Sequence, residues 1–253
     1  MEVNEMKLVL ETAQDFKKSC EAIAVLVHEA EFNLNEAGLT LKATDPSQIS
    51  MIDFELKKAA FKEFLVEKET RIGLDLDYLN QVMSRAKTDD ELTIELTPGN
   101  TTLNLTFKGT STRHFSVPLI DVSKGSVPNP KLEFQAEIKM ETSILQDALK
   151  DAELISTHVS LGVEKDVFYV KAQSSKGKLS NETNKKEKQM HSFVAKEDCS
   201  SMFPLDYLKD MAKASKSDNL IELKLRKDAP LFLSYKIGEA SISYFLAPRI
   251  ESE

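Results

Sequence analysis

Residues 77–96 read DYLNQVMSRAKTDDELTIEL, and residues 206–225 read DYLKDMAKASKSDNLIELKL. The tripeptide Asp-Tyr-Leu that opens both stretches recurs at an offset of 129 residues (206 minus 77). Lys42-Ala43 recurs as Lys171-Ala172 at the same offset (171 minus 42). Two residues related by this offset are called repeat counterparts below. One constant offset across both halves, with a period far longer than a solenoid repeat, indicates two copies of one domain.

Length and charge fit a two-domain globular protein. The 253 residues suffice for two cores, and no stretch approaches the ~20 apolar residues of a membrane helix, so we expect an intracellular chain without a membrane segment. A net charge of −8 argues against simple coating of nucleic acid but leaves a local basic surface open. Cys20 and Cys199 form no CxxC pair, and we expect buried or incidental thiols.

Each half predicts an α+β domain of antiparallel strands and two helices. Apolar residues at helical spacing, beginning with Phe16, Cys20 and Ile23, indicate the first helix, and alternating runs on either side of turn residues indicate hairpins. The expected helices span about Ala13–Val25, Asp77–Ala86, Ser143–Ala152 and Asp206–Ala214. In the second of these we expect Asp77 to cap the helix and Tyr78 to be buried.

The domain boundaries follow from a linker in the middle of the chain. We expect an N-terminal domain over residues 1–118, a connector over 119–131 and a C-terminal domain over 132–253. The connector contains Pro128-Asn129-Pro130, a composition typical of a linker. It also contains Leu119, Ile120, Val122 and Val127, which predict an extended segment lying against the surface rather than a free tether.

A catalytic site is not indicated. His28, His114, His158 and His191 have no metal-ligand spacing, and the isolated glycines form no phosphate-binding loop. The acidic pair Asp89-Asp90 lies between a helix and a strand, where a solvated turn is the ordinary interpretation. We therefore expect no catalytic residue, no metal site, no cofactor and no enzymatic activity.

Basic residues recur on the expected helices. Lys209, Lys213 and Lys216 share one helix face, and for any single helix a solvated amphipathic face is the ordinary explanation. The repetition of such faces in an acidic protein favours a shared surface that contacts phosphates without reading bases. The candidate DNA-binding residues are Lys17, Lys18, Arg85, Lys87, Lys150, Lys209, Lys213 and Lys216.

Three motifs carry a resemblance to a known family. Residues 41–51 read LKATDPSQISM, residues 229–237 read APLFLSYKI, and residues 244–251 read YFLAPRIE. The chain resembles, from end to end, the sliding clamps of the PCNA (proliferating cell nuclear antigen) type, in the archaeal and eukaryotic branch. The resemblance implies two clamp domains, each with antiparallel sheets outside and two helices inside, and three subunits closing a pseudo-sixfold ring.

The function implied by this resemblance is that of a DNA polymerase sliding clamp, a processivity factor that encircles duplex DNA. The basic positions that face DNA in this family are matched here by Lys17, Lys18, Lys150 and Lys213, and Lys209 adds a charge on the same helix as Lys213. Gln81 and Ser84 are among the positions where members of the family often carry Lys or Arg. The implied partners are a DNA polymerase, a clamp loader, a flap nuclease and a ligase. A ring of three identical chains, in the cytoplasm of an archaeon or the nucleus of a eukaryote, is expected.

The resemblance also implies a pocket for a short hydrophobic and aromatic peptide. Matching positions are Gln48, Ile49, Val127, Pro130, Pro230, Phe245, Ala247 and Pro248. The alternative is that these residues only pack the connector onto its domain.

Subunit contacts are expected between the edge strands 110–117 and 176–183, with Arg113, His114, Lys176 and Lys178 at the interface. Unpaired strand edges would otherwise favour aggregation. Two other functions stay open, namely a subunit of a checkpoint-type ring clamp and a monomeric two-domain protein-binding adaptor without a DNA role.

Overall fold

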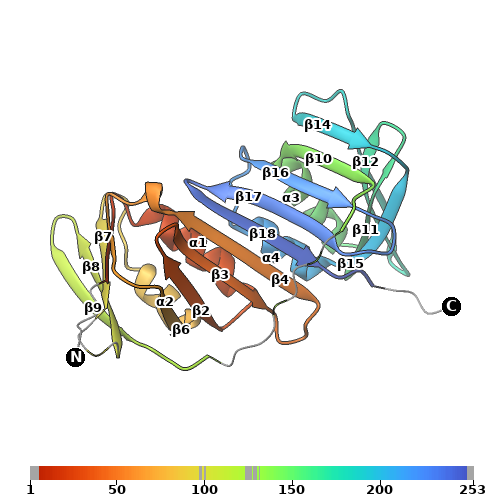
Figure 1. Cartoon of the computed structure of the whole chain (residues 1–253). Coiled ribbons are helices and arrows are strands. Elements are labelled where there is room, and N and C mark those ends of the chain that lie inside the picture. Colours follow the sequence, from red (N-terminus) through yellow and green to blue (C-terminus); the bar gives the residue numbers. More distant parts are fainter. Residues whose placement is uncertain are drawn as a thin grey trace. The chain divides into compact units, whose positions relative to one another are not determined.

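The computed structural model describes residues 6–96, 99, 101–122, 127, 130 and 132–249 (Figure 1). The chain forms two compact units. The first comprises Met1–Pro46, Ile52–Val127 and Ile237–Ile242, and the second comprises Ser47–Met51, Pro128–Lys236 and Ser243–Glu253.

The first unit contains the helices α1 (Gln14–Ala24) and α2 (Leu76–Met83) and two sets of antiparallel strands. One sheet has the order β5 (Glu63–Val66), β1 (Met6–Leu10), β7 (Glu91–Leu96), β8 (Thr102–Lys108) and β9 (Thr112–Pro118). The other set runs β4 (Ser50–Lys57), β3 (Gly38–Thr44), β2 (Glu29–Asn35) and β6 (Thr70–Asp75), and a short 3-10 turn η1 (Lys58–Ala60) follows β4.

The second unit repeats this plan with the helices α3 (Thr142–Glu153) and α4 (Leu205–Lys213). One sheet has the order β13 (Gly177–Asn184), β12 (Val167–Ser174), β11 (His158–Glu164) and β15 (Cys199–Pro204). The other set runs β14 (Met190–Ala195), β10 (Ala136–Glu141), β16 (Leu220–Leu225), β17 (Leu231–Ile237) and β18 (Ala240–Leu246).

The core of each unit lies between its helix pair and its strands. Helix α1 buries Phe16, Cys20 and Ile23 on one stripe, and β8 buries alternate residues, so that each element presents one apolar face. Within each unit the two helices pack against each other, α1 on α2 and α3 on α4 (Figure 1). The expected α+β plan with two helices per half follows directly from these two periodicities. No described helix is long and apolar enough to cross a membrane.

The N-terminus of α2 corrects two expectations. The capping residue is Asp75, not Asp77, because its extended backbone lets the carboxylate accept a hydrogen bond from the Tyr78 N–H at 2.9 Å. Asp77 instead lies in the first helical turn, where a negative charge is favourable. The Tyr78 side chain is 40% exposed, so its expected burial is wrong.

Helices α2 and α4 also end earlier than the sequence predicts. Helix α2 ends at Met83 and α4 at Lys213, which places Arg85 in the turn after α2; Lys87 and Lys216 follow the helices, as the expected bounds already had it. The expectation of buried thiols is confirmed, since Cys20 and Cys199 are both free and buried. Burial raises the pKa of the Cys199 thiol to about 11, which keeps it protonated at neutral pH.

The connector lies on the first unit over residues 119–122, as its apolar residues predict. The Ile120 N–H donates to the Gly73 carbonyl at 3.0 Å. A Cβ atom at Gly73 would collide with the Ile120 carbonyl oxygen and would lie 3.1 Å from a Val122 methyl group. Only glycine at this position leaves room for the connector. Pro128 and Asn129 of the expected linker fall outside the described residues.

We expect Gly73→Ala to displace the connector while leaving the unit folded, because the added Cβ collides with connector backbone and not with the core. Limited proteolysis should cut the connector faster in this variant than in the parent chain. Met202, the repeat counterpart of Gly73, offers a matched control, and Met202→Ala should leave connector cleavage unchanged. Equal cleavage of Gly73→Ala and the parent would contradict this account of the contact.

Candidate functional sites

The candidate DNA-binding lysines of α1 are half-buried. The Lys17 ammonium donates to the Ser84 carbonyl at 3.4 Å, which links α1 to the end of α2. Lys18 makes no ion pair with any described residue. The first helix therefore offers one cation that stabilises the helix pair and one that is available to a ligand.

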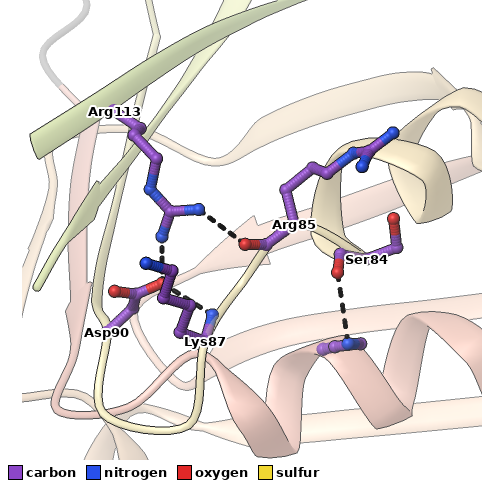
Figure 2. A network of polar contacts seen from close by, with 6 residues as sticks. Ser84, Arg85, Lys87, Asp90 and Arg113 are labelled. Carbon is purple, nitrogen blue, oxygen red and sulfur yellow. Dashed lines mark hydrogen bonds and ion pairs between the residues drawn. The ribbon is translucent and has the colours of Figure 1, made fainter. Parts of the chain in front are cut away.

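Arg85 and Lys87 use their backbones for structure and keep their side chains exposed. The Arg85 carbonyl accepts a hydrogen bond from the Arg113 guanidinium at 2.6 Å, and the Lys87 N–H donates to an Asp90 carboxylate oxygen at 2.6 Å. Figure 2 shows that the Arg85 side chain extends away from Arg113. Both cations are thus free of the network that fixes their backbone.

The basic residues of the second unit are unequal. The Lys209 ammonium is paired with Glu153 at 2.5 Å, and this hydrogen bond raises the pKa of Lys209 while its charge is largely neutralised. Lys150, Lys213 and Lys216 are exposed and have no ion pair among the described residues. The available positive charge of α3 and α4 is therefore carried by these three residues, beside the acidic side chains of the same helices.

Asp90 joins four parts of the first unit (Figure 2). Its side chain is only 2% exposed and pairs with the Arg113 guanidinium, while its second bond is to the Lys87 N–H. Its backbone carbonyl accepts from the Ala13 N–H at 2.8 Å. Arg113 of β9 is thereby tied to the end of α2, and the strand β7 to the start of α1. The expected solvated turn at Asp89-Asp90 is wrong for Asp90.

Residues of the expected peptide pocket meet in the second unit. The Ala247 N–H donates to the Ile49 carbonyl at 2.8 Å, and the Phe245 ring lies 5.2 Å from that of Phe232. Ile49, Phe245 and Ala247 remain half-buried, so part of their apolar surface is open to a ligand.

The other members of the expected pocket vary in exposure. Gln48 is exposed and has a positive φ of 58°, while Pro130, Pro230 and Pro248 are half-buried in the second unit. Val127 is half-buried in the first unit, where it lines a groove with Val122. The structure thus brings Ile49 and Ala247 of the expected pocket into direct contact, while the four apolar residues Val127, Pro130, Pro230 and Pro248 are half-buried and Gln48 is exposed.

The two segments expected at subunit contacts are both edge strands. Within the described residues β9 pairs with β8 alone, and β13 pairs with β12 alone. His114, Lys176 and Lys178 are exposed, with Lys176 in the turn before β13. Arg113 differs, because its guanidinium is bound to Asp90 and Arg85 within the chain. Its side chain is therefore committed to the fold of its own unit, a role that the sequence did not reveal.

The described residues contain no group of three or more His, Cys, Asp and Glu side chains arranged to hold a metal ion.

Comparison with known proteins places the chain in a family. Residues 5–124 match the model of the proliferating cell nuclear antigen N-terminal domain, and residues 128–250 match that of the C-terminal domain. The chain belongs to the proliferating cell nuclear antigen (PCNA) family. The expected fold class of two duplicated clamp domains is thereby confirmed.

Similar proteins cover almost the whole chain. It is 34% identical to the DNA polymerase sliding clamp of Thermofilum pendens, over 97% of this chain and 100% of the relative. It is 33% identical to the DNA polymerase sliding clamp of Methanococcus vannielii, over 95% and 97%. A solved structure of the C-terminal region of FEN-1 bound to A. fulgidus PCNA matches with a TM-score of 0.88 and 29% identity, over 98% of this chain and 100% of that one.

The internal duplication of this PCNA-family chain shows what Asp90 adds. Its repeat counterpart is Asn219, whose carbonyl accepts from the Thr142 N–H at 2.8 Å, as that of Asp90 accepts from Ala13. The repeat counterpart of Arg113 is Ile242. One copy therefore holds this junction with a buried ion pair and the other with neutral groups. The aligned repeat was the signal that could have identified position 90 as structural.

We expect Asp90→Ala to destabilise the first unit by about 3 kcal/mol, because it leaves the Arg113 guanidinium without its buried carboxylate. The double variant Asp90→Asn/Arg113→Ile copies the pair found in the second unit and should recover much of that loss. Denaturant unfolding of Asp90→Asn, of Arg113→Ile and of the double variant, each beside the parent chain, completes a double-mutant cycle. Additive losses in this cycle would mean that the two side chains are not coupled.

Proposed function

We propose that the chain is a subunit of a DNA polymerase sliding clamp, which encircles duplex DNA and tethers replication and repair proteins to it. The observation that carries this proposal is the match of both halves to the two PCNA domains. Relatives named DNA polymerase sliding clamp, 34% and 33% identical along nearly the whole chain, support it. Tethering raises the local concentration of a partner and needs no catalytic group. The proposed site of action is with the DNA inside the cell.

We propose a ring of three identical chains, in which β9 of one subunit pairs with β13 of the next. Both are edge strands with a free row of backbone groups, and pairing them removes the exposed edge. The proposed domain division at residues 119–131 gives each subunit two clamp domains. His114, Lys176 and Lys178 would lie at this contact, while Arg113 supports it from within β9.

We propose that duplex DNA is contacted without regard to sequence, through cations that make no ion pair with the described part of the chain. These are Lys18, Lys150, Lys213 and Lys216, with the exposed side chains of Arg85 and Lys87 in addition. Lysine and arginine that meet only phosphates give a nearly uniform energy along the duplex, which suits sliding. Lys17 and Lys209 contribute less, because each already serves a contact between helices.

The proposed partners are a DNA polymerase, a clamp loader, a flap nuclease and a ligase, which would bind through a short hydrophobic and aromatic peptide. The half-buried surface around Ile49, Phe245, Ala247 and Pro248 supplies an apolar floor, and the adjacent backbone can hold an extended flank. The relative from A. fulgidus, whose solved structure carries the C-terminal region of FEN-1, supports the flap nuclease as one partner.

The DNA proposal predicts topological retention on a closed circular duplex after loading by the cognate clamp loader, and release when the circle is cut. Replacing Lys18, Lys150 and Lys213 by Ala should shorten retention and make it less dependent on salt, because fewer counterions are released. The matched control is Lys185→Ala, since Lys185, which follows β13, is paired with Asp166 in the turn between β11 and β12.

Light scattering on the same samples measures the mass of the particle. A particle with the mass of one subunit at micromolar concentration would favour the monomeric adaptor over the ring. Unchanged retention of the triple variant at every salt concentration would show that these lysines form only a solvated face.

The peptide-pocket proposal predicts that Ile49→Ala weakens binding of a hydrophobic and aromatic peptide by about 1 kcal/mol or more. Ile49→Glu should weaken it further, because this change buries a charge beneath the apolar side chains of the bound peptide. The ring should persist, since Ile49 is not on β9 or β13. Isothermal titration with a synthetic peptide measures the loss, and His191→Ala serves as an exposed control. Parent-like affinity in a folded Ile49→Glu ring would leave this surface with a structural role alone.

A further inference from the structure

A groove of about 890 Å³ lies on the second unit, along the strands β11, β12, β13 and β15. Its lining is basic and rich in hydroxyl groups, and no Asp or Glu is among the described residues that line it. The charged and aromatic side chains of the lining are His158, Tyr169, Lys171, Lys178 and Arg249. In a chain with a net charge of −8, such a surface is unusual.

The first unit shows what the equivalent face holds. Glu29, Glu31 and Lys42 line a groove there, and their repeat counterparts are His158, Ser160 and Lys171. Residues of the connector lie on this face, since the Ile120 N–H donates to the Gly73 carbonyl and Val122 lines the groove.

The backbone contact that holds the connector is also duplicated. In the first unit the Ile120 N–H donates to the Gly73 carbonyl at 3.0 Å, and in the second unit the Arg249 N–H donates to the Met202 carbonyl at 2.7 Å. Both residues of the second pair are the repeat counterparts of those of the first. The second face therefore offers the same backbone contact as a face that, within this molecule, binds a segment of the connector.

The charges of the two faces have diverged. In the first unit Lys42 is paired with Asp53 at 2.9 Å and Arg71 with Glu31 at 3.5 Å, so its cations are neutralised.

In the second unit the Lys171 ammonium lies over the Tyr169 ring, 3.9 Å from its centroid, and has no ion pair among the described residues. Glu182, the repeat counterpart of Asp53, accepts a hydrogen bond from the Ser180 hydroxyl at 2.8 Å instead. Burial, and then the positive charge of Arg249, lower the pKa of His158, which agrees with an electropositive surrounding.

We propose that this groove binds an extended acidic peptide segment of a partner protein. The connector segment on the equivalent face of the first unit supports a peptide chain as the occupant, and the unpaired cations support a negatively charged one. The inference goes beyond the proposed clamp function, because the hydrophobic peptide site is built around Ile49 and Phe245. The two sites share the segment 247–249, so one partner could place its hydrophobic motif in the first and an acidic flank in the second.

The test uses the full chain and fluorescence anisotropy with a short fluorescein-labelled peptide of alternating Glu and Thr. A peptide of alternating Gln and Thr is the neutral control. Lys171→Gln should weaken binding of the acidic peptide by about threefold, the size expected for one exposed charge pair, and Lys171→Glu by more. Arg249→Gln should act in the same direction, and added salt should weaken binding in the parent.

The matched control variant is Lys42→Gln, at the repeat counterpart of Lys171 in the first unit, where the cation is already paired with Asp53. It should leave acidic-peptide binding unchanged. Neither Lys42→Gln nor Lys171→Gln should alter binding of the hydrophobic and aromatic peptide, so failure of this inference is distinguishable from failure of the proposed function.

Four results would overturn the inference. Equal binding of the neutral peptide, or equal loss in Lys42→Gln and Lys171→Gln, would remove the charge argument. A single-stranded oligonucleotide that binds as tightly, with the same dependence on Lys171, would identify a general polyanion surface. Acidic-peptide binding that appears only after Glu251 and Glu253 are both replaced by Gln would mean that these acidic residues of the chain itself occupy the groove in the parent.

Discussion

The first turn of one helix in each unit is anchored to the turn that precedes a strand, and the rest of the unit depends on this contact. The carbonyl of Asp90 accepts from the Ala13 N–H, and that of Asn219 accepts from the Thr142 N–H, both at 2.8 Å. The bond fixes the start of the first helix against the strand that follows the second helix. The helix pair then covers the apolar faces of the strands in one orientation, which decides which polar residues remain outside.

Both copies of the duplicated domain keep this backbone contact and the helix pair, whereas their surface residues differ. The first copy reinforces the junction with the buried pair of Asp90 and Arg113, and its strand β6 binds connector residue Ile120. The second copy uses neutral groups at the junction, where the Thr142 hydroxyl donates to the Asn219 carbonyl at 3.0 Å. Its equivalent sheet face carries unpaired cations. Differences between the copies at matched positions therefore separate residues that serve the fold from residues available for binding.

Much of the fold could be predicted from the sequence, because the repeat, the helix stripes and the alternating strands are local patterns. The edge position of β9 and β13 was expected only from the family resemblance, as were the residues around Ile49. The burial of Asp90 was not predicted, since its partner Arg113 lies on another strand and an acidic pair in a turn is normally solvated. Tyr78 was misjudged for a related reason, because helical spacing gives a stripe but not its width.

The net negative charge of the chain is compatible with the proposed contacts to DNA phosphates, once the partners that each lysine already has within the chain are taken into account. Lys209 is neutralised by Glu153 and Lys17 is engaged with the Ser84 carbonyl, so the helices offer fewer free charges than their sequence suggests. A protein that held DNA by affinity alone would be weakened by this, because each lost phosphate contact lowers binding. A closed ring is held by its topology instead, and strong contacts would slow its movement. Sparse, unpaired lysines therefore suit a clamp that must stay on the duplex and still slide.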